Sequence, residues 1–154
     1  MPKRWMEEKA AKEKVLNEMN FGFLGMSHEG KPYVVPMSFA YREDKIYLHA
    51  ALKGLKIEYL KNNPEVCFTV ARLNELIQNH GDLCDYSLRY QSVITRGKAT
   101  MLEDLNEKMA ALNILASKYS KGKTSSVIDP KKAEVTAVIV IDIKEMTGKY
   151  NVSV

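Results

Sequence analysis

The sequence predicts a mainly β fold with helices on its outside. Several short segments alternate between apolar and polar residues, and polar turn residues separate them, which is typical of antiparallel strands joined by hairpins. Two longer segments repeat apolar residues every three or four positions and therefore predict amphipathic helices. Runs of short strands with few helices indicate a closed antiparallel barrel with the helices outside it.

The length and composition bound the class of protein. We expect a single domain over residues 1–154, because a chain of this length can bury one sizeable core. Hydrophobic residues make up 45% of the chain and charged residues 27%, as in ordinary soluble proteins. The longest apolar run, Ala137 to Ile141, is too short to cross a bilayer, and the N-terminus leads into a charged helix rather than an apolar signal segment. We therefore expect a cytoplasmic protein.

The charge and the cysteines narrow the choice of partners. The formal net charge of +4 permits a phosphate or nucleic-acid partner without requiring one, because basic and acidic residues are interleaved. Cys67 and Cys84 are the two cysteines, and they lie too far apart in the sequence for a metal-binding pair. We expect neither a metal site nor a disulfide framework.

The elements predicted in the first half are, in order, a helix over residues 6–20 and strands over residues 21–27, 32–41 and 45–50. Ala11, Val15 and Met19 are four residues apart and define one face of the helix. Polar turn residues separate the strands. Within the strand over residues 32–41, side chains that begin with Tyr33 and Val34 alternate between two faces.

The elements predicted in the second half are a short helix that ends before Pro64, strands over residues 65–71, 88–102 and 135–144, and a helix after Asp104. Asp104 and Glu107 have the spacing of a capping box, and we interpret the apolar stripe that follows as core packing. Gly97 predicts a bend in the longest strand. Residues 72–87 predict an irregular loop, and a loop of this length often covers a functional site.

A candidate anion site lies where the strand over residues 45–50 leads into the short helix. The start of a helix offers unpaired backbone N–H groups and the positive end of the helix dipole. Lys53 and Lys56 add positive charges there, and Gly54 lets the backbone come close to an anion. His49 and its strand supply a wall against which a flat ring could lie. The alternative is an ordinary surface turn with solvated lysines.

Two blocks of sequence carry a resemblance to a known family. The first block comprises Tyr33 to Phe39, Ile46 to Ala51, Gly54 with Lys56, and Asn63 with Pro64; the second comprises Cys84 with Asp85, Tyr90 to Ile94, and Gly97 to Ala99. In order and spacing, these blocks resemble the FMN-binding split-barrel family, the superfamily of pyridoxamine 5'-phosphate oxidase. Within it, they are most similar to the branch that includes the nitroimidazole-resistance (Nim-type) proteins. The resemblance covers about residues 21–112, with a weaker match over residues 138–149.

The resemblance implies a six-stranded antiparallel split β-barrel with flanking helices and FMN as the cofactor. In the family, one strand runs along the edge of the flavin ring and supplies backbone contacts, a role that falls here to Val35, Pro36, Met37 and Ser38. Ser92 matches a polar contact to the flavin. Because side chains fill the interior of a small barrel, the flavin lies outside it, in a groove that two protomers share. The resemblance therefore implies a homodimer with the cofactor at the subunit interface.

The remaining implied contacts surround the start of the short helix. His49 and Ala50 match residues that border the flavin, and Lys56 matches a basic residue that binds the phosphate. Lys53 is assigned on its local charge alone. The oxidases proper often have an Arg-Lys pair where this chain has Leu55 and Lys56. The missing guanidinium removes a bidentate phosphate partner, so that FMN affinity is lower or Lys53 compensates.

The implied function is that of an FMN-dependent oxidoreductase, which passes electrons from a reduced nicotinamide or another donor to a small acceptor such as a nitroaromatic. In the Nim-type branch the histidine that matches His49 has been linked to function, so His49 is either catalytic or packs against the flavin. The basic residues that would commit the chain to pyridoxamine phosphate oxidation are not apparent near the C-terminus.

Two other classes of function stay open at this point. One is a flavin- or haem-binding protein without turnover, such as a sensor, and the deazaflavin F420 is a further alternative cofactor. The other is a nucleic-acid-binding module that uses Lys118, Lys121 and Lys123, although such a basic run is more often a solvated loop.

Overall fold

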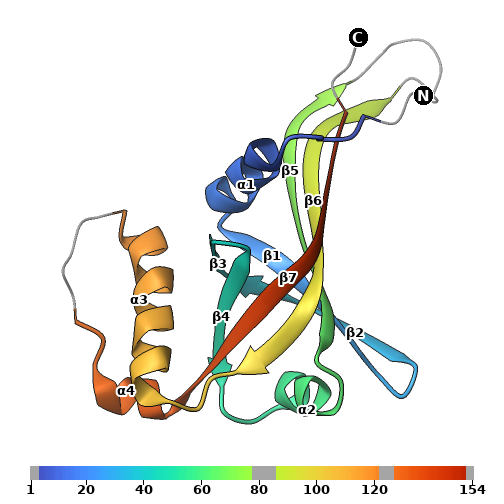
Figure 1. Ribbon diagram of the computed structural model, residues 1–154. Helices are drawn as coiled ribbons and strands as arrows, with labels where there is room; N and C mark the ends of the chain where they lie inside the picture. Colours follow the sequence, from blue (N-terminus) through green and yellow to red (C-terminus); the bar gives the residue numbers. More distant parts are fainter. Residues whose placement is uncertain (1–3, 78–85, 122–126, 152–154) are drawn as a thin grey trace.

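The computed structural model describes residues 4–77, 86–121 and 127–151. The elements are α1 (Lys9–Glu18), β1 (Phe21–His28), β2 (Lys31–Ser38), β3 (Ala40–Arg42), β4 (Lys45–Ala51), α2 (Leu55–Asn62), β5 (Glu65–Ile77), β6 (Ser87–Met101), α3 (Leu105–Ser120), α4 (Pro130–Glu134) and β7 (Thr136–Asn151). The strands form one antiparallel sheet with helices around it, which confirms the predicted mainly β fold (Figure 1). Within the described ranges, no helix is long and apolar enough to cross a membrane.

The order of the strands makes the sheet return toward its own start. The strands pair in the order β2-β1-β5-β6-β7-β4-β3, so β2 and β3 are the two edges. These edges are consecutive in the chain and are separated only by Phe39. The predicted strand over residues 32–41 is therefore interrupted, because its first part pairs with β1 and its last part with β4. Seven strands are described and the two edges are not paired with each other, so a closed six-stranded barrel is not confirmed.

The strands β5, β6 and β7 are longer than the rest, and their ends extend beyond the other four strands (Figure 1). The prediction of an irregular loop over residues 72–87 is wrong at its start, because Arg72 to Ile77 continue β5 and pair with β6. A register shift between Leu73 and Glu75 interrupts the period-two pattern there, which explains why the sequence does not predict a strand. The turn predicted around His80 lies outside the described residues.

Gly97 marks the bend that the sequence predicts in β6. The register between β6 and β7 shifts between Arg96 and Gly97. A Cβ atom at Gly97 would lie 2.1 Å from the carbonyl oxygen of Asp142 in β7, a distance that no side chain can tolerate. The close approach of the two strands therefore requires glycine at this position.

The core lies against the inner face of the curled sheet. In β2, Val35 packs against the core and Met37 is buried, whereas Val34 on the other face is 60% exposed, as the alternation predicts. Phe39 is fully buried, and its ring centre lies 4.9 Å from that of Phe68 in β5. The helices α1 and α2 add Val15, Leu16, Ile57 and Leu60 to this core.

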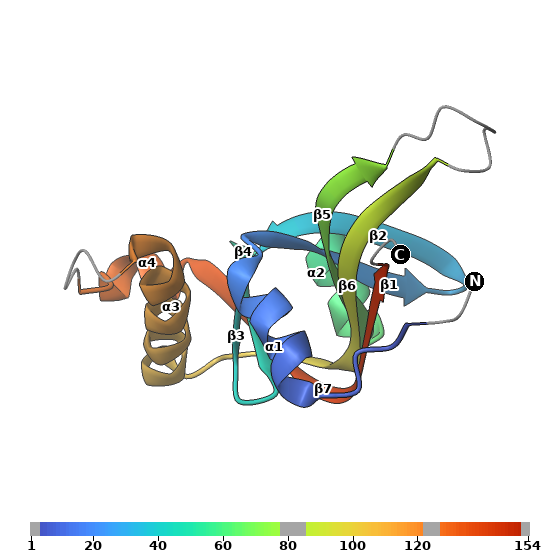
Figure 2. The same ribbon diagram turned by 90° about the horizontal axis from the view of Figure 1, so that it is seen from above.

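The helix α3 lies outside the sheet, beside β4 (Figure 2). Its last turn contacts both the end of α1 and Phe39, the residue between β2 and β3. The Lys118 ammonium donates hydrogen bonds to the carbonyl oxygens of Leu16 (3.3 Å) and Met19 (2.5 Å) at the end of α1. The same ammonium lies 3.7 Å from the centre of the Phe39 ring, a favourable cation–π geometry. One lysine thus joins three segments that are distant in the sequence.

Burial at this junction predicts a pH dependence of stability. It lowers the pKa of Lys118 from 10.5 to about 8. Between these values the unfolded chain binds more protons at this position than the folded chain, so the free energy of unfolding rises with pH. Well below pH 8 the lysine is charged in both states, and its contribution to the slope vanishes.

Urea unfolding of the wild type and of Lys118→Met at several pH values between about 7.5 and 9.5 measures this contribution. The free energy of unfolding should rise with pH more steeply in the wild type than in Lys118→Met. Other titrating groups are common to both proteins and cancel in the comparison. Equal slopes would show that the ammonium is not desolvated.

Candidate functional site

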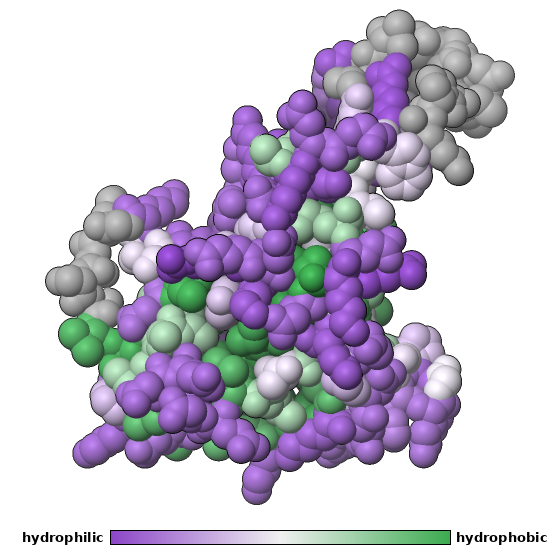
Figure 3. Space-filling view, viewed as in Figure 1, coloured by the Kyte–Doolittle hydropathy of each residue, from purple (hydrophilic) through white to green (hydrophobic). Residues whose placement is uncertain are grey.

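Two of the predicted site residues, Ser38 and His49, lie at one cavity. It has a volume of about 280 Å³, and its wall is completed by the apolar side of α3; the lining residues are Ser38, His49, Leu112, Leu115, Ala116 and Tyr119. Ser38 is the last residue of β2, and His49 comes from β4. In the space-filling view, apolar residues gather on the lower half of the face between α3 and the sheet, with hydrophilic residues around them (Figure 3). The cavity thus combines a mostly apolar wall with a few polar groups, as ligand sites do.

The cavity exists because β3 is short. In β4, Ile46 and Leu48 are buried, so the alternation turns His49 outward. On one side His49 pairs with Val138 of β7, but on the other side β3 reaches only as far as Tyr47. The helix α3 covers the space beyond, where no further residue of β3 is available. The imidazole of His49 is therefore exposed at the mouth of a cavity rather than packed in the core.

Tyr119 holds the chain in place next to Ser38. Its hydroxyl accepts a hydrogen bond from the Phe39 N–H (2.8 Å). The same oxygen lies within donor distance of the carbonyl oxygens of Asn20 (2.6 Å) and Phe39 (3.0 Å). The N–H of the single residue that interrupts the edge strand is thereby satisfied, and the one hydroxyl proton is shared between the two carbonyl oxygens. Tyr119 therefore determines where β2 ends and which way Ser38 faces the cavity.

Sequence reasoning missed the contribution of α3 to this site. The apolar stripe of the helix was interpreted as core packing, but Leu112, Ala116 and Tyr119 line the cavity beside His49. A tyrosine at the end of such a stripe is a weak signal for this role, because its hydroxyl needs a polar partner. Only the folded structure shows that the partner is the backbone of Phe39.

The start of α2 fits an anion. Gly54, directly before the helix, has a φ of +131°, and no atom lies within 4 Å of where its Cβ would be. No side chain caps this helix start. Lys56 is half-buried, and burial lowers its pKa, whereas Lys53 is exposed. Within the described residues, no carboxylate lies within ion-pair distance of either lysine, so an anionic group would find unpaired N–H groups and an uncompensated cation there.

The other predicted contacts on β2 divide by face. The side chains of Val35 and Met37 face the core, whereas Pro36 and Ser38 are exposed. Met37 can therefore contact a ligand through its backbone but not through its side chain, in keeping with the backbone role that the resemblance implies. Because β2 is an edge of the sheet, one side of its backbone is free of strand partners among the described residues.

Ser92 lies elsewhere on the molecule. It lines a different cavity of about 340 Å³, together with Trp5, Ile94, Arg96, Glu145, Thr147 and Lys149. In the sheet, β7 separates its strand β6 from the strand that carries His49. One chain therefore does not bring Ser92 and His49 to the same cavity.

Ser38 and Ser92 nevertheless share the outer face of the sheet, which sequence reasoning did not single out. On this face Phe21 pairs with Ser38, and Phe23 pairs with Pro36. The two phenylalanines are 52% and 43% exposed, and their rings meet edge to face with centres 5.8 Å apart. Period two in β1 could have revealed them, because their neighbours along the strand face the core.

Comparisons with known proteins connect this geometry to a family. The family model described as pyridoxamine 5'-phosphate oxidase matches residues 8–150. The chain belongs to this family. The match covers nearly the whole sequence, and it confirms the resemblance to the FMN-binding split-barrel proteins. Among curated proteins, none matches the chain.

Solved structures of this fold agree. A proposed 5-nitroimidazole antibiotic resistance protein from Bacteroides thetaiotaomicron is 36% identical, with a TM-score of 0.83 over 96% of this chain and 87% of that one. The flavocytochrome Anf3 from Azotobacter vinelandii is 21% identical, with a TM-score of 0.83 over 97% of this chain and 70% of that one. The FAD and heme binding protein from Mycobacterium smegmatis is 16% identical, with a TM-score of 0.89 over 97% and 74%. The last two share the fold with this chain.

The role of Tyr119 can be tested by removing its hydroxyl. Tyr119→Phe leaves the buried Phe39 N–H without its acceptor, so the free energy of unfolding should fall by about 1 to 3 kcal/mol. Chemical denaturation measures the change. The matched control is Tyr86→Phe, since Tyr86 is half-exposed and its hydroxyl makes none of the described hydrogen bonds. Equal stability of Tyr119→Phe and the wild type would contradict the assigned role.

Proposed function

We propose that the protein binds FMN at the interface of a homodimer and acts as an oxidoreductase, passing electrons from a reduced nicotinamide or another donor to a small acceptor such as a nitroaromatic. The observation that carries the proposal is the meeting of Ser38 and His49 at one apolar-walled cavity in a chain of this family. The relative from Bacteroides thetaiotaomicron, named for resistance to a nitroaromatic antibiotic, supports the class of acceptor. When bound, the flavin supplies the redox chemistry, and the protein positions it.

Different residues of this chain bind different parts of the FMN. The Lys56 ammonium and the first N–H groups of α2 receive the phosphate, and Gly54 leaves room for its oxygens. The backbone of β2 runs along the ring, with Val35, Pro36 and Met37 contributing main-chain groups. The apolar side chains of α3 keep water from the cavity, which strengthens each polar contact within it.

His49 lies where it can act on a bound acceptor. Its imidazole is exposed at the cavity mouth, opposite the apolar wall of α3. An imidazolium can give up a proton near neutral pH and a neutral imidazole can accept one, which suits a histidine to protonate a reduced acceptor. The alternative role is packing against the flavin ring beside Ala50.

A second copy of the chain completes the site in this proposal. The outer face of the sheet exposes Phe21, Phe23, Val34 and Ile94 together, and such an apolar face on a soluble protein favours a partner. Ser92 lies on this same face, away from the cavity at His49 of its own chain. A homodimer formed through this face would allow Ser92 of one protomer to approach the flavin held by the other.

The competing functions are distinguished by simple measurements. The flavocytochrome and the FAD and heme binding protein share this fold, which keeps a flavin- or haem-binding protein without turnover as the second candidate. Reduction of the bound flavin by NADH or NADPH, followed by turnover of an added nitroaromatic, separates an enzyme from such a carrier. The nucleic-acid alternative loses one of its three lysines, because the Lys118 ammonium bonds to carbonyl oxygens of α1. Lys123 lies outside the described residues.

The phosphate role of Lys56 gives a direct test. Lys56→Ala removes a charge-assisted hydrogen bond worth about 1.5 to 3 kcal/mol, so the Kd for FMN should rise at least about tenfold. Quenching of flavin fluorescence on titration into flavin-free protein measures it. The matched control is Lys61→Ala, which removes an exposed lysine from the other end of the same helix. If both variants bind FMN as the wild type does, Lys56 has no part in the site.

A further inference from the structure

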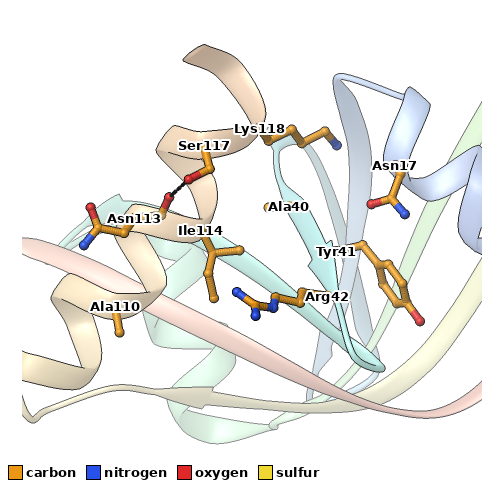
Figure 4. Close-up of a pocket in the computed structure, with 9 residues that line it drawn as sticks. All are labelled: Asn17, Ala40, Tyr41, Arg42, Ala110, Asn113, Ile114, Ser117 and Lys118. Atoms are coloured by element: carbon orange, nitrogen blue, oxygen red, sulfur yellow. Dashed lines mark hydrogen bonds between the residues drawn. The ribbon is translucent and has the colours of Figure 1, made fainter. Parts of the chain in front are cut away.

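A second, larger cavity lies on the other side of α3. It has a volume of about 540 Å³ and is bounded by α1, β3 and α3; its lining residues are Asn17, Ala40, Tyr41, Arg42, Ala110, Asn113, Ile114, Ser117 and Lys118 (Figure 4). None of these residues lines the cavity at His49. We call this cavity the α1–α3 groove. Its volume is in the range of sites for small organic ligands.

The charge of the α1–α3 groove is one-sided. Of the residues that the structure describes, its lining includes Arg42 and Lys118 but no carboxylate. The nearby acids have other partners: Glu13 accepts a hydrogen bond from the Tyr41 hydroxyl (2.6 Å), and Asp44 accepts one from Lys9 (2.7 Å). A cleft lined by one sign of charge attracts ligands of the opposite sign.

The two cations can act on a ligand in different ways: Arg42 can bind it directly, whereas Lys118, which is bonded to carbonyl oxygens, acts through its charge. The Arg42 side chain reaches into the space between β3 and α3, and its ion pair with Glu43 is long, 3.6 Å, between two exposed side chains (Figure 4). Such a pair contributes little and is easily exchanged. Among the described residues, the partners of the Lys118 ammonium are neutral, and its burial lowers its pKa. An anion in the groove would supply the missing counter-charge.

The rest of the lining suits an apolar body with a polar end. Ala40, Ala110 and Ile114 present alkyl groups, whereas the Tyr41 side chain is buried and its hydroxyl is turned toward Glu13. The Asn17 side chain points into the same space from α1 (Figure 4). Its amide can donate to a ligand oxygen. The planar fork of an arginine matches the two oxygens of a carboxylate.

We propose that the α1–α3 groove binds a small organic carboxylate with an apolar, ring-sized body. The carboxylate pairs with Arg42 and lies within the field of Lys118, and the body packs against Ala40, Ala110 and Ile114. This site is separate from the proposed flavin site and does not depend on it. Because α3 contributes to both cavities, occupancy of one can alter the other through this helix.

The test uses 1-naphthoate as the probe and its neutral analogue 1-naphthamide as the charge control, each titrated calorimetrically into the purified protein with whatever flavin it retains. We expect one naphthoate per chain and at least about tenfold weaker binding of the amide, the factor that corresponds to about 1.4 kcal/mol. Arg42→Gln and the nearly isosteric Asn17→Asp should each weaken naphthoate binding at least tenfold. The control Asn106→Asp, in the first turn of α3 and outside the groove, should bind naphthoate as the wild type does.

Three results of the binding measurements would each overturn the proposal. They are the absence of naphthoate binding, equal affinity for the acid and the amide, and unchanged affinity in both Arg42→Gln and Asn17→Asp. Release of bound flavin by naphthoate in direct competition would also overturn it, because that would place the probe in the flavin site. Loss of FMN binding without loss of naphthoate binding would instead count against the proposed function alone. Circular dichroism of each variant shows that it is folded.

Discussion

The structure depends on how the chain is held at Phe39. This residue interrupts a strand whose first part pairs with one end of the sheet and whose second part pairs with the other. Its ring is buried against Phe68, and its backbone N–H donates a hydrogen bond to the Tyr119 hydroxyl. Lys118 covers the ring and bonds to the end of α1. This junction fixes the point at which the chain leaves one edge of the sheet and joins the other.

The same junction sets the positions of both cavities. The helix α3 can lie beside β4 because Tyr119 and Lys118 fix its last turn, and its two sides then face different parts of the protein (Figure 2). One side covers Ser38 and His49, and the other side forms the α1–α3 groove with Arg42. A ligand on either side therefore contacts the helix that shapes the other.

Much of this arrangement follows from the pattern of residues, and the remainder depends on tertiary contacts. Period two correctly turns Met37 inward and His49 outward, because it reports only which face of a strand is buried. The interruption at Phe39 has no local signal, since neither glycine nor proline stands there and the strand pattern continues through it. There the Phe39 N–H bonds to a tyrosine eighty positions later. The continuation of β5 past Arg72 is hidden by a register shift in the same way.

In the candidate site, too, some features follow from the sequence pattern and others depend on tertiary contacts. The predicted residues at the start of α2 and at the end of β2 lie where an anion and a flat ring could be held, because strand and helix termini can be located from sequence. The wall formed by α3 and the separation of Ser92 from His49 could not be predicted, because they depend on the order of strands in the sheet. Because of that separation, Ser92 can contribute to the proposed flavin site only from a second chain.

The central claim is that one chain carries half of a flavin site and that two chains complete it. Sedimentation velocity of the FMN-loaded protein, recorded both at the protein absorbance and at the visible flavin absorbance, tests it most directly over a range of protein concentrations. We expect the flavin signal to sediment only with the two-chain species. As the dimer dissociates, the flavin should be released and stop sedimenting with the protein. Flavin that sediments with single chains, or a dimer that binds none, would contradict it.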